Sequence, residues 1–235
     1  KLLTKNDIKI NSVIPSKCSI DDIKKASKSK LNIVTDMIAL PLANEMKENL
    51  GIDYIYFDKH MEKEIIYNNY KQIEKILNID LVKYLDEQIK IYDELFDKCK
   101  KLYSGKKLIY GNTPIMALEL SYFLSELGIE PVFIQLRELY EQDIKYQEKL
   151  LNKGYNPYIS RVANIAPLRE LYDKIGANIY VGHENPMLLK EKGLTQITLD
   201  AHSQKIGYEL PIGIMNDLVE LAKNSSIGGF KNASM

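Results

Sequence analysis

Short runs of β-branched and aromatic residues alternate along the chain with longer stretches in which apolar residues recur every three or four positions. The first pattern predicts strands, and the second predicts amphipathic helices. This alternation is typical of an α/β fold with parallel sheets, because each helix carries the chain back to the start of the next strand. The predicted strands are Ile8–Ile14, Leu31–Thr35, Tyr54–Phe57, Lys107–Tyr110, Pro131–Gln135, Tyr158–Val162, Asn178–Val181 and Thr195–Leu199.

Three of these units share one layout: a strand, a polar residue at its tip, a proline, a helix, a glycine and a second strand. Proline suits a first helical turn because its missing N–H needs no partner there, and glycine past the last turn adopts the left-handed conformation. The strand tips are of more interest, since ligands of open α/β sheets bind outside the carboxyl ends of the strands. The tip residues are Asp36, Asn112 and His183 with Glu184.

A stretch without proline or glycine separates the first two strand groups. Its periodicity predicts two helices, Glu62–Leu77 and Asp80–Tyr103. Asp80 is the expected N-cap of the second helix, and lysines fill its last turn, as the helix dipole favours. A final helix is predicted over Pro211–Lys223.

The long second helix is expected to connect two Rossmann-like lobes with parallel sheets. The first lobe covers residues 1–104 and ends with that helix, and the second covers residues 105–223. The remaining residues, 224–235, are rich in Ser, Gly and Asn and are expected to form a flexible tail. A ligand is expected in the cleft between the lobes.

Charge and motifs narrow the function. Lys+Arg and Asp+Glu number 32 each, so no net charge attracts nucleic acid or an anionic membrane. The sequence has no apolar run near the roughly 20 residues of a membrane span and no signal peptide, which favours a cytoplasmic chain. The glycine motifs of dinucleotide and P-loop sites are missing, as are the nucleophile-elbow and HExxH patterns. Any chemistry is therefore expected to need a cofactor or a partner.

Four blocks, taken in order, resemble one known family. The blocks resemble the nitrogenase component 1 superfamily, which includes the molybdenum–iron protein α and β subunits, the cofactor-assembly scaffold and the dark-operative protochlorophyllide reductase subunits. The chain resembles the second and third of that family's three Rossmann-like domains, and its start without Met fits a piece of a longer subunit. The blocks are INSVIPSKCSIDDIKKASKSKLNIVTD (Ile10–Asp36), NLGIDYIYFD (Asn49–Asp58), GKKLIYGNTPIMALELSYFLSELGIEPVFI (Gly105–Ile134) and ANIYVGHENPMLLKEKGLTQITLDAHSQKIGYE (Ala177–Glu209).

The resemblance implies a subunit of an oxidoreductase, or a cofactor-assembly scaffold. Such a subunit holds an iron–sulfur cluster, an iron–molybdenum-type cofactor or a tetrapyrrole between its domains. The implied partners are a homologous component 1 subunit and an ATP-dependent reductase similar to the nitrogenase iron protein. Because the family's first domain carries most of the cluster cysteines, the isolated chain is expected to be inactive.

Two positions of the resemblance bear on the cofactor. Where the family's α subunit has a Cys on the cofactor's terminal iron, this sequence has Asp36, whose hard oxygens suit a soft iron–sulfur site poorly. The triplet Ala201-His202-Ser203 resembles the family's His-Ser pair, whose His binds molybdenum. The resemblance therefore implies His202 as the metal ligand, and it favours the assembly-scaffold or uncharacterised nitrogenase-like branches over a nitrogen-reducing site.

Each tip residue also has a structural alternative. Asp36 could cap the helix that begins near Met37, and Glu184 or Asn185 could cap the helix that follows them. His202 could be a loop histidine bonded to the backbone. All of these remain open on the sequence alone.

The other reactive side chains point to structural roles. Cys18 precedes the predicted N-cap Ser19 and could have a lowered pKa, but one thiol cannot hold a cluster. Cys99 lies among lysines late in a helix, and His60 is expected to be solvated. Arg161 and the pair Arg137-Glu138 follow strands and could bind a carboxylate or form ion pairs.

A second hypothesis comes from a different class of protein. Two Rossmann-like lobes joined by a long helix also describe bilobed metal- or haem-binding receptors with a rigid helical backbone. The missing signal peptide and the missing N-terminal lipid-anchored Cys count against it. An enzyme subunit should pair with a homologous subunit, whereas a receptor should bind its ligand as a monomer.

Overall fold

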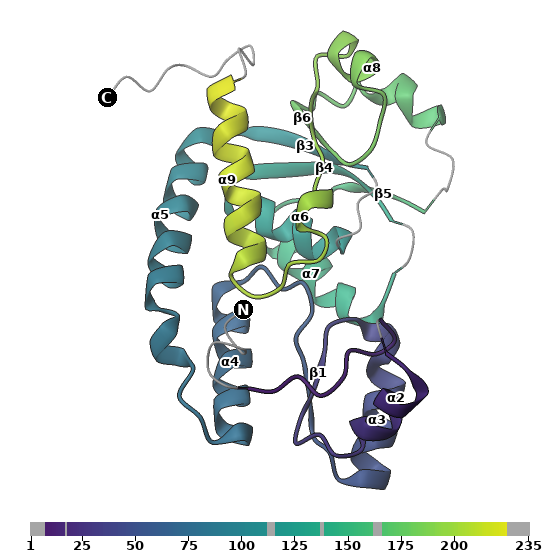
Figure 1. The fold of residues 1–235 in the computed structure, drawn as a ribbon. Helices are drawn as coiled ribbons and strands as arrows, with labels where there is room; N and C mark the ends of the chain where they lie inside the picture. The colour runs from purple at the N-terminus through teal and green to yellow at the C-terminus, as the bar shows by residue number, and fades with distance from the viewer. Residues whose placement is uncertain (1–7, 17, 112–115, 137–138, 162–165, 225–235) are drawn as a thin grey trace. The chain divides into compact units, whose positions relative to one another are not determined.

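The computed structural model confirms the α/β class with parallel sheets (Figure 1). Its described residues divide into two compact units. The first unit ends at Lys90 and also includes Ile206–Tyr208, and the second unit contains the other residues after Lys90. The split falls inside helix α5 (Asp86–Tyr103). No described helix is both long and apolar enough to cross a membrane. The structure describes residues 8–16, 18–111, 116–136, 139–161 and 166–224.

The first unit contains a small parallel sheet. Its strands are β1 (Asn32–Val34) and β2 (Tyr54–Tyr56), in which Val34 lies opposite Tyr56. Helix α3 packs against both strands, and α4 packs against β2. The helical segments of this unit are α2 (Ile20–Ala26), η1 (Met37–Ala39), α3 (Leu40–Leu50), α4 (Lys63–Leu77), η2 (Val82–Tyr84) and the start of α5.

Helix α3 begins and ends with the residue types that the sequence predicts. Pro41 lies in its first turn, and Gly51 ends it with a φ of 68°. A left-handed φ of this size is strained for residues that carry a Cβ atom, which explains the glycine. The prediction of this helix and of β2 after it is confirmed.

The predicted strand over Ile8–Ile14 is wrong. Residues 8–14 form no strand, and no described strand pairs with them. The side chain of Asn11 instead donates hydrogen bonds to the Lys25 carbonyl at 2.6 Å and to Ser29 Oγ at 3.2 Å. Without a neighbouring strand to pair its N–H and C=O groups, an apolar run does not become a strand.

The predicted start of the long helix at Asp80 is also wrong. The segment after α4 forms the short 3₁₀ turn η2, and α5 begins at Asp86. The reason lies in Glu74, whose Oε1 accepts hydrogen bonds from the amides of Leu81 at 2.7 Å and Val82 at 2.8 Å. A side chain from the preceding helix therefore already binds the Val82 amide, which an Asp80 cap would have bound.

The second unit is a five-stranded parallel sheet in the order β5-β4-β3-β6-β7. Consecutive strands are connected through helical segments, as the periodicity predicts. A core of buried residues, among them Ile109, Phe133 and Tyr180, packs around the sheet. The elements are β3 (Lys106–Tyr110), α6 (Ala117–Glu126), β4 (Ile129–Gln135), α7 (Glu141–Asn152), β5 (Tyr158–Ser160), η3 (Ala166–Leu171), β6 (Ile179–Val181), α8 (Pro186–Glu191), β7 (Thr195–Ile197), η4 (Asp200–His202) and α9 (Glu209–Asn224).

Helices α5 and α9 lie side by side in the second unit (Figure 1). Tyr103 is fully buried, and its hydroxyl donates to the Leu218 carbonyl at 2.7 Å. One turn earlier, Cys99 Sγ donates to the Met215 carbonyl at 3.4 Å. The final helix predicted over Pro211–Lys223 is confirmed as α9, and residues 225–235 of the predicted tail lie outside the described structure.

The chain returns to the first unit for three residues, Ile206–Tyr208, just before α9. Tyr208 is fully buried there, and its hydroxyl donates to the Lys63 carbonyl at 3.1 Å. Its ring stacks on Tyr70 with centroids 6.5 Å apart. Gly207, with a φ of 63°, lies against the ring and hydroxyl of Tyr70. The first unit is therefore completed by residues from the far end of the sequence.

Candidate functional site

The strand order of the second unit selects one place on its sheet. The chain builds β3, β4 and β5 outward in one direction and then adds β6 and β7 on the other side of β3. The reversal lies between β3 and β6, and open α/β sheets bind ligands at the carboxyl ends of such strands. Gly111 follows β3 at this edge, and Gly182, His183 and Glu184 follow β6.

Gly111 has to be glycine for a steric reason. A Cβ atom at this position would lie 2.2 Å from the hydroxyl oxygen of Tyr180, which is itself almost fully buried. The backbone at the end of β3 thus packs directly on an aromatic ring of β6. The next residue, the predicted ligand Asn112, lies outside the described residues.

Glu184 is a buried carboxylate at the tip of β6, with a side chain only 2% exposed. It accepts two parallel hydrogen bonds from Arg169, Nε to Oε2 at 3.0 Å and Nη2 to Oε1 at 2.8 Å. Tyr172 adds a third bond at 3.2 Å, and the amide of Asn185 adds a fourth at 2.7 Å. Burial raises the pKa of this carboxyl, but the hydrogen bonds from Arg169, Asn185 and Tyr172 outweigh burial and hold the pKa below its ordinary value.

The rest of the loop after β6 is fixed as firmly. The side-chain amide of Gln196 donates to the carbonyls of Gly182 at 2.9 Å and Glu184 at 3.1 Å. Asn185 caps α8 by accepting from the Met187 amide at 2.9 Å, which confirms the predicted cap. The loop therefore presents His183 from a rigid base, the condition under which a binding side chain is held in one geometry.

His183 forms an exposed pair with Asp200. Its Nε2 lies 3.0 Å from Oδ1 and 2.9 Å from Oδ2 of Asp200, which follows β7. Both side chains are more than half exposed. A carboxylate on Nε2 makes this nitrogen the proton donor and directs Nδ1 away from the pair, so the arrangement leaves one ring nitrogen for a proton, a ligand or a metal.

His202, by contrast, is buried and bonded at both ring nitrogens. Nε2 lies 2.6 Å from Asp217 Oδ2 on α9, and Nδ1 lies 2.9 Å from Lys205 Nζ. The ring also packs on Gly213, where a Cβ atom would come within 2.6 Å of Nδ1. The partners are side chains, not the backbone that the alternative for a loop histidine predicted. Asp217 occupies Nε2, so Nδ1 is the ring nitrogen that could bind a metal. Lys205 would first have to move away from Nδ1.

Asp36 lies in the first unit and caps a helix. Its Oδ1 accepts from the Ile38 amide at 3.0 Å, at the start of η1. This confirms the structural alternative for Asp36, and the residue remains exposed at the tip of β1. Its role toward a cofactor stays a prediction.

A family-model comparison decides what kind of chain this is. The model of the nitrogenase component 1 type oxidoreductases matches residues 1–222. The chain belongs to this family. A comparison with curated proteins finds no match.

Two solved structures extend the comparison to three dimensions. The chain is similar to nitrogenase Cp1 at pH 6.5, with a TM-score of 0.71 and 12% identity over 95% of this chain and 54% of that one. It is also similar to nitrogenase Cp1 at pH 5, with a TM-score of 0.68 and 15% identity over 96% and 53% of the two chains. At such identities the likeness shows the fold. The chain spans about half the length of the nitrogenase chains that it matches.

The described residues do not fit an iron–sulfur cluster of the nitrogenase kind on their own. Among them, no group of three or more His, Cys, Asp or Glu side chains could hold a metal ion. Cys99 is fully buried in the α5–α9 contact, and burial raises the pKa of its thiol to about 12. A thiol of this kind stays protonated at neutral pH, which disfavours it as a metal ligand because the ligand form is the thiolate.

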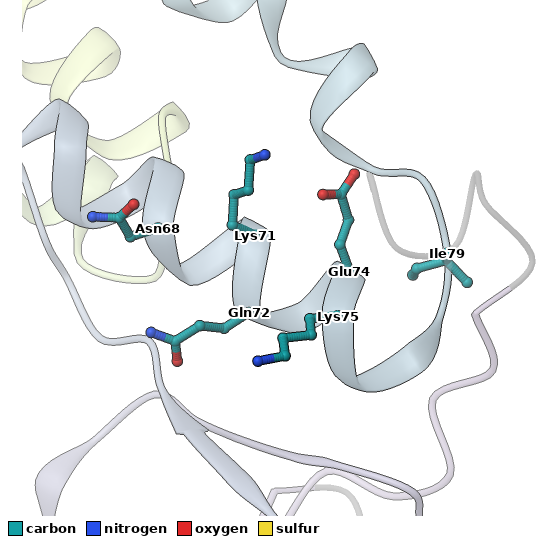
Figure 2. A pocket seen from close by; sticks show the side chains of 6 residues that line it. All are labelled: Asn68, Lys71, Gln72, Glu74, Lys75 and Ile79. Atoms are coloured by element: carbon teal, nitrogen blue, oxygen red, sulfur yellow. The ribbon is translucent and has the colours of Figure 1, made fainter.

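One hollow of the first unit is lined by none of the candidate residues. It measures about 550 Å³ and lies along α4. Figure 2 shows the lining side chains, which come from α4 and, for Ile79, from the segment after it, pointing in different directions. Glu74, one of them, already caps Leu81 and Val82. Its lining residues are Asn68, Lys71, Gln72, Glu74, Lys75 and Ile79.

A second hollow, of about 420 Å³, adjoins the candidate site in the second unit. Arg169 and Asn185 line it, so the buried carboxylate network forms one of its walls. Lys192, also in the lining, pairs with Asp173 at 3.0 Å. This hollow gives the network at Glu184 access to solvent on one side.

Of the expectations about the other polar residues, the one for His60 is wrong, the one for Arg161 stays a prediction, and the one for Arg137-Glu138 cannot be followed in the described residues. His60 is buried and not solvated, with its ring 5.7 Å from that of Tyr56 in an edge-on contact. Arg161 is exposed, and the pair Arg137-Glu138 lies outside the described residues. The sequence argument missed Arg169, Tyr172 and Asp200. For Arg169 the sequence offered one sign, the rarity of arginine in this lysine-rich chain, and it offered none for the other two.

Proposed function

We propose that this chain provides two Rossmann-like units of a nitrogenase component 1 type oxidoreductase subunit or of a related cofactor-assembly scaffold. In this role it helps to hold an iron–sulfur cofactor or a tetrapyrrole. The observation that carries the proposal is the family match over residues 1–222. The parallel sheet with its reversal point between β3 and β6 supports it, because that edge is where such folds bind ligands.

The ligand set of the described residues limits what the chain contributes. Thiolates for a cluster would have to come from other parts of the subunit or from its partner, since the described residues hold no ligand group of three. A second component 1 subunit and an ATP-dependent reductase similar to the nitrogenase iron protein are the proposed partners. The chain alone is therefore expected to be inactive.

The chain's own contribution is a fixed polar edge. His183 is held by Asp200 at Nε2 and has Nδ1 left to accept a proton or a hydrogen bond from a bound group. Glu184 and Arg169 hold the loop beneath it. Its chemistry toward a bound cofactor is thus to orient the group and to accept or donate a proton at Nδ1.

Anaerobic reconstitution with iron and sulfide tests the proposal. The chain is compared with a version extended by the family's first domain, and iron content and thiolate-to-iron absorbance are measured. Cluster uptake by the extended protein alone, reduced by His183→Ala or His202→Ala, supports it. Uptake of haem or a metal ion by the monomeric 235-residue chain would instead support the receptor hypothesis, which the family match does not favour.

A further inference from the structure

Two buried carboxylates occupy equivalent positions on neighbouring helices of the second unit. Glu119 lies in the first turn of α6 and is 3% exposed, and Asp143 lies in the first turn of α7 and is 4% exposed. Each is the third residue of its helix. Neither belongs to the His183 and Glu184 site.

The contacts between α6 and α7 show that these positions share one register. One turn beyond the two carboxylates, Tyr122 and Tyr146 face each other with ring centroids 5.9 Å apart. At the far end of the contact, Lys153 pairs with Glu126. The two helices therefore run in the same direction and bring their first turns, with Glu119 and Asp143, to the same end.

Asp143 is only half satisfied at this place. Its Oδ2 accepts from the Tyr140 amide at 2.9 Å, whereas its Oδ1 is buried without a hydrogen-bond partner among the described residues. A buried carboxylate oxygen without a partner is costly when charged and is relieved when it carries a proton.

The charges around Asp143 act in both directions. Burial raises the pKa of Asp143 most, the charge of Glu119 on α6 raises it further, and Lys145 on α7 lowers it, with the pKa brought to about 6. Lys145 lies over the Tyr146 ring at 4.7 Å from its centroid, and Lys149 lies over the same ring at 5.2 Å. The ammonium groups of Lys145 and Lys149 thus contact the Tyr146 ring and do not form a hydrogen bond with Oδ1 of Asp143.

We propose that Asp143 and Glu119 form a proton-binding acid pair, in which Asp143 carries a proton in mildly acidic solution and releases it to water before the pH reaches neutrality. The released state adds the charge of Asp143 in the first turn of α7 to that of Glu119 in the first turn of α6. Helix dipoles favour a negative charge at each of these ends, but they do not remove the repulsion between the two. The contact between the helices is weaker in that state.

The position of the acid pair in the sheet determines which helices its protonation affects. Helix α6 follows β3, and α7 follows β4, so both first turns lie at the carboxyl edge of the sheet. Uptake of one proton tightens the helices that follow β3 and β4, on the side of the sheet away from β6. The pair is a pH sensor at the same carboxyl edge of the sheet as the candidate site, and it does not depend on the proposed function.

Urea unfolding of the chain between about pH 4.5 and pH 7.5 tests the pair, with Asp143→Asn as the main variant. Asn keeps an oxygen for the Tyr140 amide but carries no charge. The unfolding constant of the wild type, divided by that of the variant, should rise about 10- to 100-fold over this range. A ratio that stays flat overturns the proposal.

Two further variants separate the pair from a general effect of charge. Glu119→Gln removes the neighbouring charge and should shift the rise to lower pH. Glu141→Gln removes an exposed charge from the same turn of α7 and should leave the rise as in the wild type. Carboxyl ¹³C NMR of the unmodified chain should show one aspartate that titrates near pH 6. The absence of such an aspartate would contradict the proposal even if no Asp143 variant folds.

Discussion

The guanidinium of Arg169 donates two parallel hydrogen bonds, of 3.0 Å and 2.8 Å, to the carboxylate of Glu184. Arg169 belongs to η3, which precedes β6, and Glu184 belongs to the loop that follows β6. The contact therefore ties together the two segments that flank one strand. Only arginine offers this fork, because a lysine ammonium is a single point of charge.

Glu184→Gln should destabilise the chain by about 1–3 kcal/mol, since the amide loses one arm of the fork and leaves a buried donor facing Arg169. Urea unfolding at neutral pH measures the change. Glu170→Gln is the matched control, because it removes an exposed charge next to Arg169. Equal stability of the two variants would show that the ion pair contributes nothing.

The same carboxylate predicts a pH dependence. The pKa of Glu184 in the folded chain lies below its ordinary value of 4.5, so the unfolded chain binds its proton first as the pH falls. The stabilisation is then complete above about pH 4.5 and is lost as the pH drops through the folded pKa. The stability difference between wild type and Glu184→Gln should shrink in that window. A difference that grows on acidification would reverse the sign.

His183 should exist as a single tautomer with its proton on Nε2, because that nitrogen faces Asp200 at 2.9 Å. Long-range ¹H–¹⁵N NMR of the neutral imidazole in alkaline solution distinguishes the tautomers. Asp200→Asn should give a mixture of both, with a stability change of only about 0.5 kcal/mol for so exposed a pair. A single tautomer in both proteins would mean that Asp200 does not orient the ring.

Gly213→Ala should destabilise the chain by about 1–3 kcal/mol, because the new methyl group would meet the His202 ring at 2.6 Å. In a His202→Ala background the same substitution should stabilise α9 by up to about 1 kcal/mol, as alanine usually does in a helix. Thermal unfolding of the four proteins in the cycle measures both effects. The prediction fails if Gly213→Ala has the same effect in the two backgrounds.

Cys99 should resist alkylation in the folded chain, and Cys18 should not. Burial raises the pKa of the Cys99 thiol to about 12, whereas Cys18 is only half-buried. A short iodoacetamide pulse followed by peptide mass spectrometry should label Cys18 first, and Cys99 only after unfolding in urea. Labelling of Cys99 at the same rate would mean that α5 and α9 separate readily.

The fold could be predicted where local pattern and local geometry agree. The β-branched runs around Val34 and Ile109 are strands because a neighbouring parallel strand pairs with each. The similar run at Ile8–Ile14 has no such partner, and the start of α5 is moved by Glu74 from the previous helix. Neither fact is visible in the pattern of one segment, since both depend on a second segment.

The candidate site divides in the same way. Asp36, His183 and Asn185 could be found because strand tips and caps have fixed places relative to strands and helices. Arg169 and Asp200 come from short 3₁₀ turns 15 and 17 residues from their partners, and no periodicity relates them. His60 illustrates the limit of polarity as a guide, because its polar neighbours in sequence do not keep it in water.

Tyr208 has a practical consequence for anyone who dissects the chain. It is fully buried among residues more than a hundred positions earlier, with its hydroxyl on the Lys63 carbonyl. The first unit cannot be isolated intact by truncating the chain at one point, because truncation after α5 removes Tyr208 from its buried position. Half-length expression products should therefore be prone to aggregation, and a circularly permuted gene that joins 206–208 to the first unit is the rational route to an isolated half.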